Sequence, residues 1–261
     1  FLSKRIIINL NVKIKMPKNS VCIIGLGFVG LTLAVIMAKK GFKVYGVEKN
    51  KFILEQLKHN KSHFYEPGIN NELKKIIKAK KFVFYSKIPK KNDINTYIIT
   101  VGTPLNKNKK INIEYISSTC HQLSKLIKDE DCVILRSTVK IGTSRNIVGK
   151  ILSKTKKKIK LAYCPERAVE GAAMKELNFL PQVIGGIDNV SVNFAKKIFN
   201  KITKKIVPVS SLEAAEMVKL IDNSSRDVFF AYANEIARVC DSIGLDANEI
   251  INSGKKNYNR T

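Results

Sequence analysis

A glycine-rich turn is the first segment whose residue types and spacing point to chemistry. It reads GLGFVG over residues 25–30 and lies between a short β-type apolar run and a helical pattern. In such a turn the first glycine permits a tight bend, the second lets backbone N–H groups approach a pyrophosphate, and the third allows close packing of helix on strand. The pattern predicts a dinucleotide site, the alternative being a glycine turn without a nucleotide. The predicted contacts are Gly25, Gly27, Phe28, Val29 and Gly30.

An acidic residue at the end of the second predicted strand supports a nucleotide at this turn. Glu48 follows Gly30 by 18 residues, where a carboxylate accepts hydrogen bonds from the adenosine ribose hydroxyls. A carboxylate there repels a 2′-phosphate, so NAD is favoured over NADP as the cofactor. The neighbouring Lys49 and Lys51 weaken this preference.

Hydroxyl-bearing turns follow two later predicted strands. Residues 100–104 read TVGTP, and residues 137–139 read STV. Ligands of open parallel sheets bind beyond the carboxyl ends of the strands, so Thr103 and Thr138 are expected to face the cofactor. Local capping is the alternative, because Ser and Thr at loop starts commonly bond to nearby backbone. The EPG sequence at 66–68 leaves the same choice between a turn and a site.

Two further clusters could act on a substrate. Residues 164–171 read CPERAVEG, and Glu166 and Glu170 beside an arginine could hold a water or a sugar hydroxyl, one of them as general base. A solvated loop with an internal ion pair is the alternative. Lys219 and Asn223 share one face of a predicted helix. They could stabilise an oxyanion or polarise an alcohol, or belong to an ordinary exposed helix face.

The elements that must position these residues alternate in type up to about residue 208. Short apolar runs predict strands at 21–24, 43–47, 82–85, 97–101, 132–135, 160–163, 182–185 and 205–207. Amphipathic stretches between them predict helices, among them 112–127, 143–152 and 190–201. This alternation is typical of an α/β fold, a Rossmann-type doubly wound parallel sheet with helices on both faces.

Beyond Pro208 the pattern becomes helical. One helix of about eight turns is predicted over 213–241, followed by a short helix from about Ala247. We therefore expect three parts: an N-terminal extension, a cofactor-binding domain and a helical central domain. Their bounds are 1–19, with Met16 as a possible start, 20–208 and 209–261.

The charge balance raises the question of an anionic partner. The chain has 261 residues, 47 Lys and Arg against 21 Asp and Glu, and a formal net charge of +26. Such an excess is compatible with nucleic-acid or polyanion binding. Only seven of the basic residues are Arg, however, and the lysines are spread along the chain. Because Arg is favoured where phosphate is recognised, a compositional bias explains the charge better, and we expect no nucleic-acid partner.

Cysteine usage and hydropathy indicate a cytoplasmic protein without a metal site. Five Cys without a C-x-x-C pair and three scattered His argue against a disulfide framework and a metal cluster. Residues 21–38 are uncharged, at the lower length limit of a membrane span. Glycines interrupt this run, so a strand, a turn and a buried helix explain it better, and we expect no membrane partner. No signal peptide is expected at residues 1–15.

Six blocks in order along the chain resemble the nucleotide-sugar 6-dehydrogenases, the UDP-glucose/GDP-mannose dehydrogenase family. They read VCIIGLGFVGLTLA, YEPGI, VGTPL, RSTVKIGT, CPERAVEG and EAAEMVKLIDNSSRDVFFAYANE. The family oxidises the C6 alcohol of a UDP- or GDP-sugar to a carboxylate in two NAD-dependent hydride transfers. The CPER sequence is closer to the N-acetylhexosamine branch of the family. The resemblance therefore implies a UDP-N-acetylhexosamine substrate and a role of the enzyme in surface-polysaccharide synthesis.

The resemblance also implies roles for individual residues. It implies ribose binding by Glu48, cofactor contacts by Thr103 and Thr138, and active-site roles for Thr138 and Glu166. Lys219 and Asn223 would hold a water and the oxyanion, and a glutamate of the CPER loop would activate the hydrolytic water. Glu170 is harder to place, since the N-acetylhexosamine branch commonly has a different residue there. The helix 213–241 would be the homodimer element.

One expected feature of the family is missing from this sequence. The family's nucleophilic Cys lies in a glycine-rich segment after the helical domain, followed by a nucleotide-binding domain. None of the five Cys lies in such a segment, so we expect this chain to be the N-terminal part of such an enzyme, able to bind NAD and inactive alone. The alternatives are a basic Rossmann-like nucleic-acid or polyanion binder and a hydroxy-acid dehydrogenase of the same superfamily.

Overall fold

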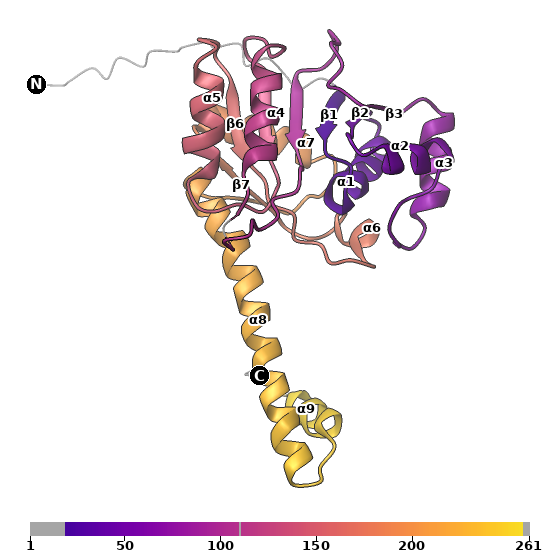
Figure 1. Ribbon diagram of the computed structural model, residues 1–261, viewed down its shortest axis with the longest axis vertical. Helices are drawn as coiled ribbons and strands as arrows, with labels where there is room; N and C mark the ends of the chain where they lie inside the picture. Colours follow the sequence, from indigo (N-terminus) through magenta and orange to yellow (C-terminus); the bar gives the residue numbers. More distant parts are fainter. Residues whose placement is uncertain (1–18, 110, 258–261) are drawn as a thin grey trace, which may run out of the picture. The chain divides into compact units, whose positions relative to one another are not determined.

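The structure is a computed structural model that describes residues 19–109 and 111–257 (Figure 1). The predicted extension lies outside these residues except for Asn19, and so does the predicted start at Met16. The chain forms two compact units, the first ending at Glu216 and the second beginning at Met217. The division therefore falls inside the long helix, a few residues after the predicted boundary at 208.

In the described part of the chain, eight strands form one sheet in the order β3-β2-β1-β4-β5-β6-β7-β8. They are β1 (Ser20–Ile24), β2 (Lys43–Val47), β3 (Phe82–Tyr85), β4 (Thr96–Ile99), β5 (Cys132–Leu135), β6 (Lys160–Tyr163), β7 (Gln182–Gly186) and β8 (Ile206–Pro208). The chain starts at the centre and winds outward in both directions, so the predicted doubly wound Rossmann-type sheet is confirmed. β4 ends at Ile99, which leaves Thr100 and Val101 in the loop at its carboxyl end.

Helices connect most of these strands. The first unit contains α1 (Phe28–Lys39), α2 (Lys51–Lys58), α3 (Ile69–Lys78), α4 (Glu114–Ser124), the π-helical turn η1 (Ser144–Gly149), α5 (Lys150–Ser153), α6 (Ala173–Glu176) and α7 (Asn189–Phe199). β1 holds the start of the uncharged run and α1 its remainder from Phe28 onward, so this run forms a strand, a turn and a buried helix, as predicted. The helix predicted at 143–152 is divided between η1 and α5.

One strand pair departs from the predicted parallel sheet. β7 lies antiparallel to β6, with Tyr163 opposite Gly185, whereas every other neighbouring pair named above is parallel. A parallel connection needs a crossover helix that carries the chain back to the other end of the sheet. Between β6 and β7 the structure has only the short α6 (Figure 1). The chain therefore enters β7 at the same end of the sheet at which it left β6.

The sheet is covered on both faces, since every residue of β1, β4, β5, β6 and β7 is buried. Ile98, Ile134 and Ala162 belong to one core cluster, together with buried side chains of α1, α3 and α7. The next residues along two of these strands, Ile99 and Leu135, are also buried but lie outside that cluster. Since side chains alternate across a strand, the latter face the other layer, where α4 packs against η1 and α5.

Beyond the sheet the chain is helical. α8 (Leu212–Ser242) begins in the first unit and continues into the second, where α9 (Ala247–Lys255) follows. Both helices were predicted, with ends within a few residues of those observed. Every helix in the described ranges is too short or too polar to cross a lipid bilayer.

Candidate cofactor and active site

The glycine-rich turn has a backbone that other residues would strain. Gly25 has φ +94°, a left-handed conformation, and a Cβ there would lie 2.9 Å from the carbonyl oxygen of Thr100. A Cβ on Gly30 would lie 1.8 Å from the carbonyl oxygen of Gly25, so helix α1 can approach the strand only through a glycine. These two glycines therefore bring the N-terminus of α1 directly onto the end of β1.

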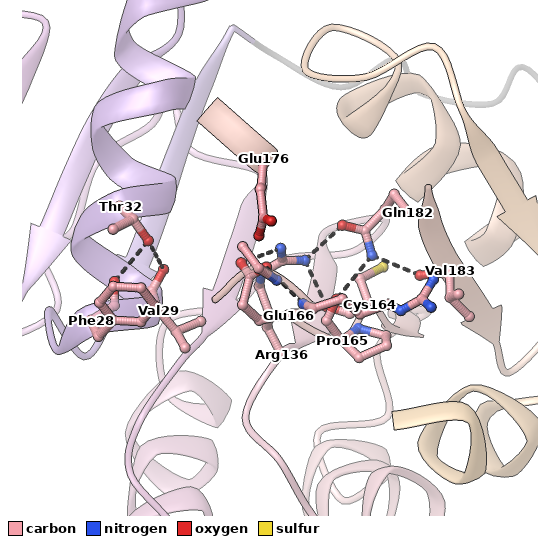
Figure 2. Close-up of polar contacts among 12 residues, drawn as sticks. Phe28, Val29, Thr32, Arg136, Cys164, Pro165, Glu166, Glu176, Gln182 and Val183 are labelled. Atoms are coloured by element: carbon pink, nitrogen blue, oxygen red, sulfur yellow. Dashed lines mark hydrogen bonds and ion pairs between the residues drawn. The ribbon is translucent and has the colours of Figure 1, made fainter. Parts of the chain in front are cut away.

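The N-terminus of α1 is open to a phosphate. Its N-cap is Gly27, which offers no side chain to the first N–H groups of the helix, and a Cβ at Gly27 would meet nothing within 4 Å. Thr32 donates its hydroxyl to the carbonyl oxygen of Phe28 at 2.7 Å, inside the helix and away from the turn (Figure 2). N–H groups without a side-chain cap, the helix dipole and free space make this helix end suitable for an anion.

This turn forms one side of the main cleft of the first unit. The cleft has a volume of about 770 Å³, within the range of small-molecule sites. It brings together most of the predicted cofactor residues: Gly25, Gly27, Phe28, Val29, Glu48, Thr103 and Thr138. Gly30 is the exception, since it is buried behind the turn, where it serves the packing of helix on strand.

Glu48 is fixed at the rim of the cleft by backbone donors. Its Oε2 accepts from Leu26 N at 2.8 Å, and its Oε1 accepts from Lys49 N at 2.7 Å and Asn50 N at 2.9 Å. An ionised carboxylate has about four acceptor positions, two on each oxygen, so Oε2 retains one position for a ligand hydroxyl. The glycine-rich turn thus helps to fix the carboxylate at the cleft.

The two predicted hydroxyl turns meet at the carboxyl edge of the sheet. Thr103 donates its hydroxyl to the carbonyl oxygen of Thr138 at 2.7 Å, and Ser137 donates to that of Val101 at 2.6 Å. The buried phenol of Tyr163 donates to the carbonyl oxygen of Ser137 at 3.1 Å. These three bonds join residues 26 to 36 positions apart, so they are not the local capping that was the alternative, and they hold the two turns together at the cleft.

One wall of the cleft was not found by sequence reasoning. Tyr115, Thr119 and Gln122 of α4 line it, opposite Ser86 and Ile88. Their spacing of four and three residues places them on one helix face. Tyr115 is 52% exposed. The spacing of these three residues indicates a common helix face in the sequence. Only the order of the strands shows that this face of α4 lies beside the cleft.

Glu166 lies in a buried ion pair. Its Oε2 accepts from Arg136 Nη2 at 2.6 Å, and its Oε1 accepts from the backbone N–H groups of the next two residues. Arg136 also donates from Nη1 to Cys164 O and to Gln182 Oε1, both at 2.8 Å (Figure 2). Glu166 and Arg136 are 6% and 2% exposed. The loop is therefore not solvated at Glu166, and Arg136, which sequence reasoning had no reason to single out, anchors it.

Glu170, the other predicted acid of this loop, is exposed. The residue after it, Gly171, has φ +85° and donates its N–H to Glu66 Oε2 at 2.9 Å. The sequence did not decide whether the EPG segment at 66–68 is a turn or part of a site. In the structure its Glu66 is in contact with the CPER loop.

A buried glutamate ties the start of α8 to the loop that follows Thr138. Glu216 is fully buried, and its carboxylate accepts from Gly142 N at 2.5 Å and Ser144 N at 2.8 Å. Glu213, one turn earlier, pairs with Arg145. Neither glutamate was predicted as a site residue.

Lys219 and Asn223 lie farther along α8, in the second unit. Asn223 Oδ1 accepts from Arg226 Nη2 at 3.1 Å. The two residues share a helix face, as predicted. Their catalytic roles stay predictions.

Burial disfavours the thiolate form of four of the five cysteines. Burial raises the pKa of Cys22, Cys120 and Cys164 to about 12 and that of Cys132 well above its ordinary value. A thiol becomes a nucleophile through its thiolate. Cys164 therefore does not serve as one, although it begins the CPER loop.

Comparison with known proteins agrees with this geometry. Residues 19–203 match the NAD binding domain of the UDP-glucose/GDP-mannose dehydrogenase family, and residues 213–260 match its central domain. The UDP-N-acetyl-D-mannosamine dehydrogenase of Methanocaldococcus jannaschii is 34% identical over 249 residues, which are 93% of this chain and 57% of that protein. That of Methanococcus maripaludis is 32% identical over 90% of this chain and 55% of its own length.

A solved structure supports the same conclusion. The UDP-D-ManNAc dehydrogenase of Pyrococcus horikoshii superposes with a TM-score of 0.86 at 27% identity, over 93% of this chain and 58% of that one. The chain thus spans about half the length of the relatives it matches. Since both of its domains are matched, the chain belongs to the UDP-glucose/GDP-mannose dehydrogenase family and has its NAD-binding domain.

Proposed function

We propose that the whole protein oxidises the C6 alcohol of a UDP-N-acetylhexosamine to the uronic acid, with NAD as oxidant, for surface-polysaccharide synthesis. The observation that carries the proposal is the cleft in which the phosphate turn, Glu48 and Thr138 converge. The curated relatives named UDP-N-acetyl-D-mannosamine dehydrogenase support the sugar class. The CPER sequence at 164–167 supports it independently.

The residues of the first unit fit NAD. The N–H groups at the start of α1 would bind the pyrophosphate, and Glu48 would accept from the adenosine ribose. Thr103 and Thr138, at the carboxyl edge beyond β4 and β5, would contact the nicotinamide end. NAD would supply the hydride acceptor: oxidising the alcohol to a carboxylate transfers two hydrides from the substrate to two NAD molecules, consumes one water and releases protons to the surrounding groups.

The remaining predicted residues would handle those protons and the oxygen of the substrate. Lys219 and Asn223 would hold a water and stabilise the developing oxyanion. A glutamate of the CPER loop, Glu166 or Glu170, would activate the hydrolytic water. Cys22, Cys120, Cys132 and Cys164 are held as thiols, so we propose that none of them is the nucleophile of the second oxidation.

Titration calorimetry with NADH tests the cofactor assignment. We expect Glu48→Gln to weaken NADH binding about tenfold, because a charged acceptor of the ribose bonds is lost, and to reduce the discrimination against NADPH. Glu55→Gln on the exposed face of α2 is the matched control and should bind like the wild type. A wild-type chain that binds no NADH at millimolar concentration would refute the proposal.

We also propose that the protein is a homodimer through α8. Phe229 and Phe230 are 67% and 66% exposed in the single chain, and Val228 and Tyr232 beside them are equally so. Apolar surface of this kind is stabilised by burial against a second copy. Sedimentation velocity should show a dimer that Phe229→Glu dissociates. Phe52→Glu, on α2 and 61% exposed, should leave it intact, and a monomeric wild type would contradict the proposal.

A further inference from the structure

Glu66 joins two loops that are far apart in the sequence. It is only 4% exposed. Its Oε2 accepts from Gly171 N at 2.9 Å, and its Oε1 accepts from Met174 N at 3.0 Å. Both donors belong to the connection between β6 and β7, whereas Glu66 precedes α3. A single buried carboxylate thus fixes the backbone directly after Glu170.

The segment that carries Glu66 also contacts the phosphate turn. The ring of Phe64 lies 5.2 Å from the ring of Phe28 in an edge-to-face arrangement. Phe28 is the first residue of α1 and lines the cofactor cleft. The segment itself is held in place, since Ser62 N donates to Asn70 Oδ1 at 2.7 Å and Phe64 N donates to Ser62 Oγ at 3.2 Å. A continuous series of contacts therefore leads from the cleft to the CPER loop.

We propose that Glu66 is a positioning residue, which holds the loop that carries Glu170 and couples the order of this loop to occupancy of the dinucleotide cleft. A dinucleotide bound at the turn restricts Phe28 and, through its ring contact, Phe64. Glu66, two residues on, transmits this restriction to Gly171 and Met174. If the dinucleotide has already ordered the loop, the sugar substrate binds without the entropy cost of ordering it. Binding of the substrate is therefore favoured. The inference rests on the proposed function for the identity of the cofactor.

Two features make the carboxylate hard to replace. Hydrogen bonds to an ionised acceptor are about twice as strong as neutral ones. Glutamine keeps the shape of the side chain but replaces one acceptor by an N–H₂ group, which would face a backbone N–H donor. Glu66→Gln therefore removes one bond, weakens the other and preserves the volume.

Hydrogen exchange of the 261-residue chain, with and without NADH, tests the proposal. In the wild type, NADH should slow exchange of the Gly171 and Met174 amides. In Glu66→Gln these amides should exchange about tenfold faster or more without ligand, and NADH should no longer slow them. Glu176→Gln is the matched control, because Glu176 binds the N–H of Val169 in the same loop but has no part in the bridge. It should leave the NADH effect at Gly171 and Met174 unchanged.

A second variant separates the coupling from the stability of the loop. Phe64→Leu keeps the carboxylate of Glu66 and removes the ring contact, so basal protection at Gly171 should remain while the response to NADH is lost. Unchanged exchange in Glu66→Gln would overturn the positioning role. A wild type that binds NADH without any change at Gly171 would overturn the coupling. If the wild type does not bind NADH, the proposed function fails, and exchange without ligand still decides the positioning role.

Discussion

Nη2 of Arg136 lies 2.6 Å from Oε2 of Glu166, and the two side chains are only 1% and 8% exposed. The pair connects the end of β5 to the loop after β6, and Gln182 at the start of β7 completes it by accepting from Nη1. Three neighbouring strand ends are therefore fastened by one guanidinium (Figure 2). Glu166 is therefore already paired with Arg136. Any action of Glu166 on a water would take place within this ion pair or after the pair has opened.

Removal of the cation should destabilise the first unit strongly. Arg136→Met leaves the Glu166 carboxylate buried without its partner, which typically costs about 3–5 kcal/mol. Urea unfolding followed by circular dichroism measures the change. Arg238→Met breaks an exposed ion pair with Glu235 and should cost about 0–1 kcal/mol. Equal effects of the two substitutions would show that the buried pair contributes little to stability.

Tyr115 should stack on the adenine of the cofactor. In the proposed cofactor position Glu48 would bind the ribose, and Tyr115 of α4 lines the same cleft with an aromatic ring. Stacking on an aromatic ring contributes about 1–3 kcal/mol per base, so Tyr115→Ala should weaken NADH and ADP-ribose about tenfold in calorimetry. Nicotinamide mononucleotide should be unaffected, and Tyr115→Phe should retain full affinity. Wild-type affinity in Tyr115→Ala would place the adenine elsewhere.

Acid should weaken the first unit partly through Glu213. The Nε of Arg145 donates to Glu213 Oε1 at 2.6 Å, and this bond is the main cause that lowers the pKa of Glu213 from 4.5 to about 2. A lowered pKa means stabilisation that is present above about pH 4.5 and is lost as the pH falls toward 2. The pair is partly exposed, so the contribution is at most about 1 kcal/mol.

Urea unfolding between pH 6 and pH 2.5 measures this contribution. Glu213→Gln should be less stable than the wild type at pH 6, and the difference should disappear at the acid end. Glu235→Gln, in an exposed ion pair, is the control and should show little difference at either pH. A Glu213→Gln difference that stays constant with pH would contradict the assignment.

The thiols should resist modification in the folded protein. With the pKa of Cys22, Cys120 and Cys164 raised to about 12, only about one thiol in ten thousand is ionised at pH 8. Reaction with dithionitrobenzoate should therefore be slow in buffer and reach five equivalents in guanidinium chloride, one for each Cys in the sequence. Rapid labelling of Cys164 in the native state would revive it as a candidate nucleophile.

The features predicted best from the sequence were those determined by neighbours in the chain. The strand, turn and helix around Gly25 and Gly30 were predictable because a tight bend and close packing each demand a glycine at a fixed spacing. Glu48 followed from the same unit, since the second strand ends beside the turn. NAD as the cofactor was predicted on this basis and is confirmed by the family assignment.

Features that depend on distant segments were missed. The pairing of Arg136 with Glu166 joins residues 30 positions apart, and no periodicity relates them. The direction of β7 depends on the absence of a crossover helix before it, whereas its apolar sequence suits either direction. Tyr115 was indistinguishable from a surface tyrosine until the sheet order placed α4 at the cleft.

The antiparallel direction of β7 affects how this fold can diversify. Because β7 runs antiparallel to β6, the chain leaves β6 and enters β7 at the same end of the sheet, and residues 164–181 form the connection there. Insertions at its exposed residues 169–171 would lengthen a surface loop without shifting the register of any strand. This connection is therefore the place where sugar preference could evolve, or be engineered, while the cofactor half of the site remains as it is.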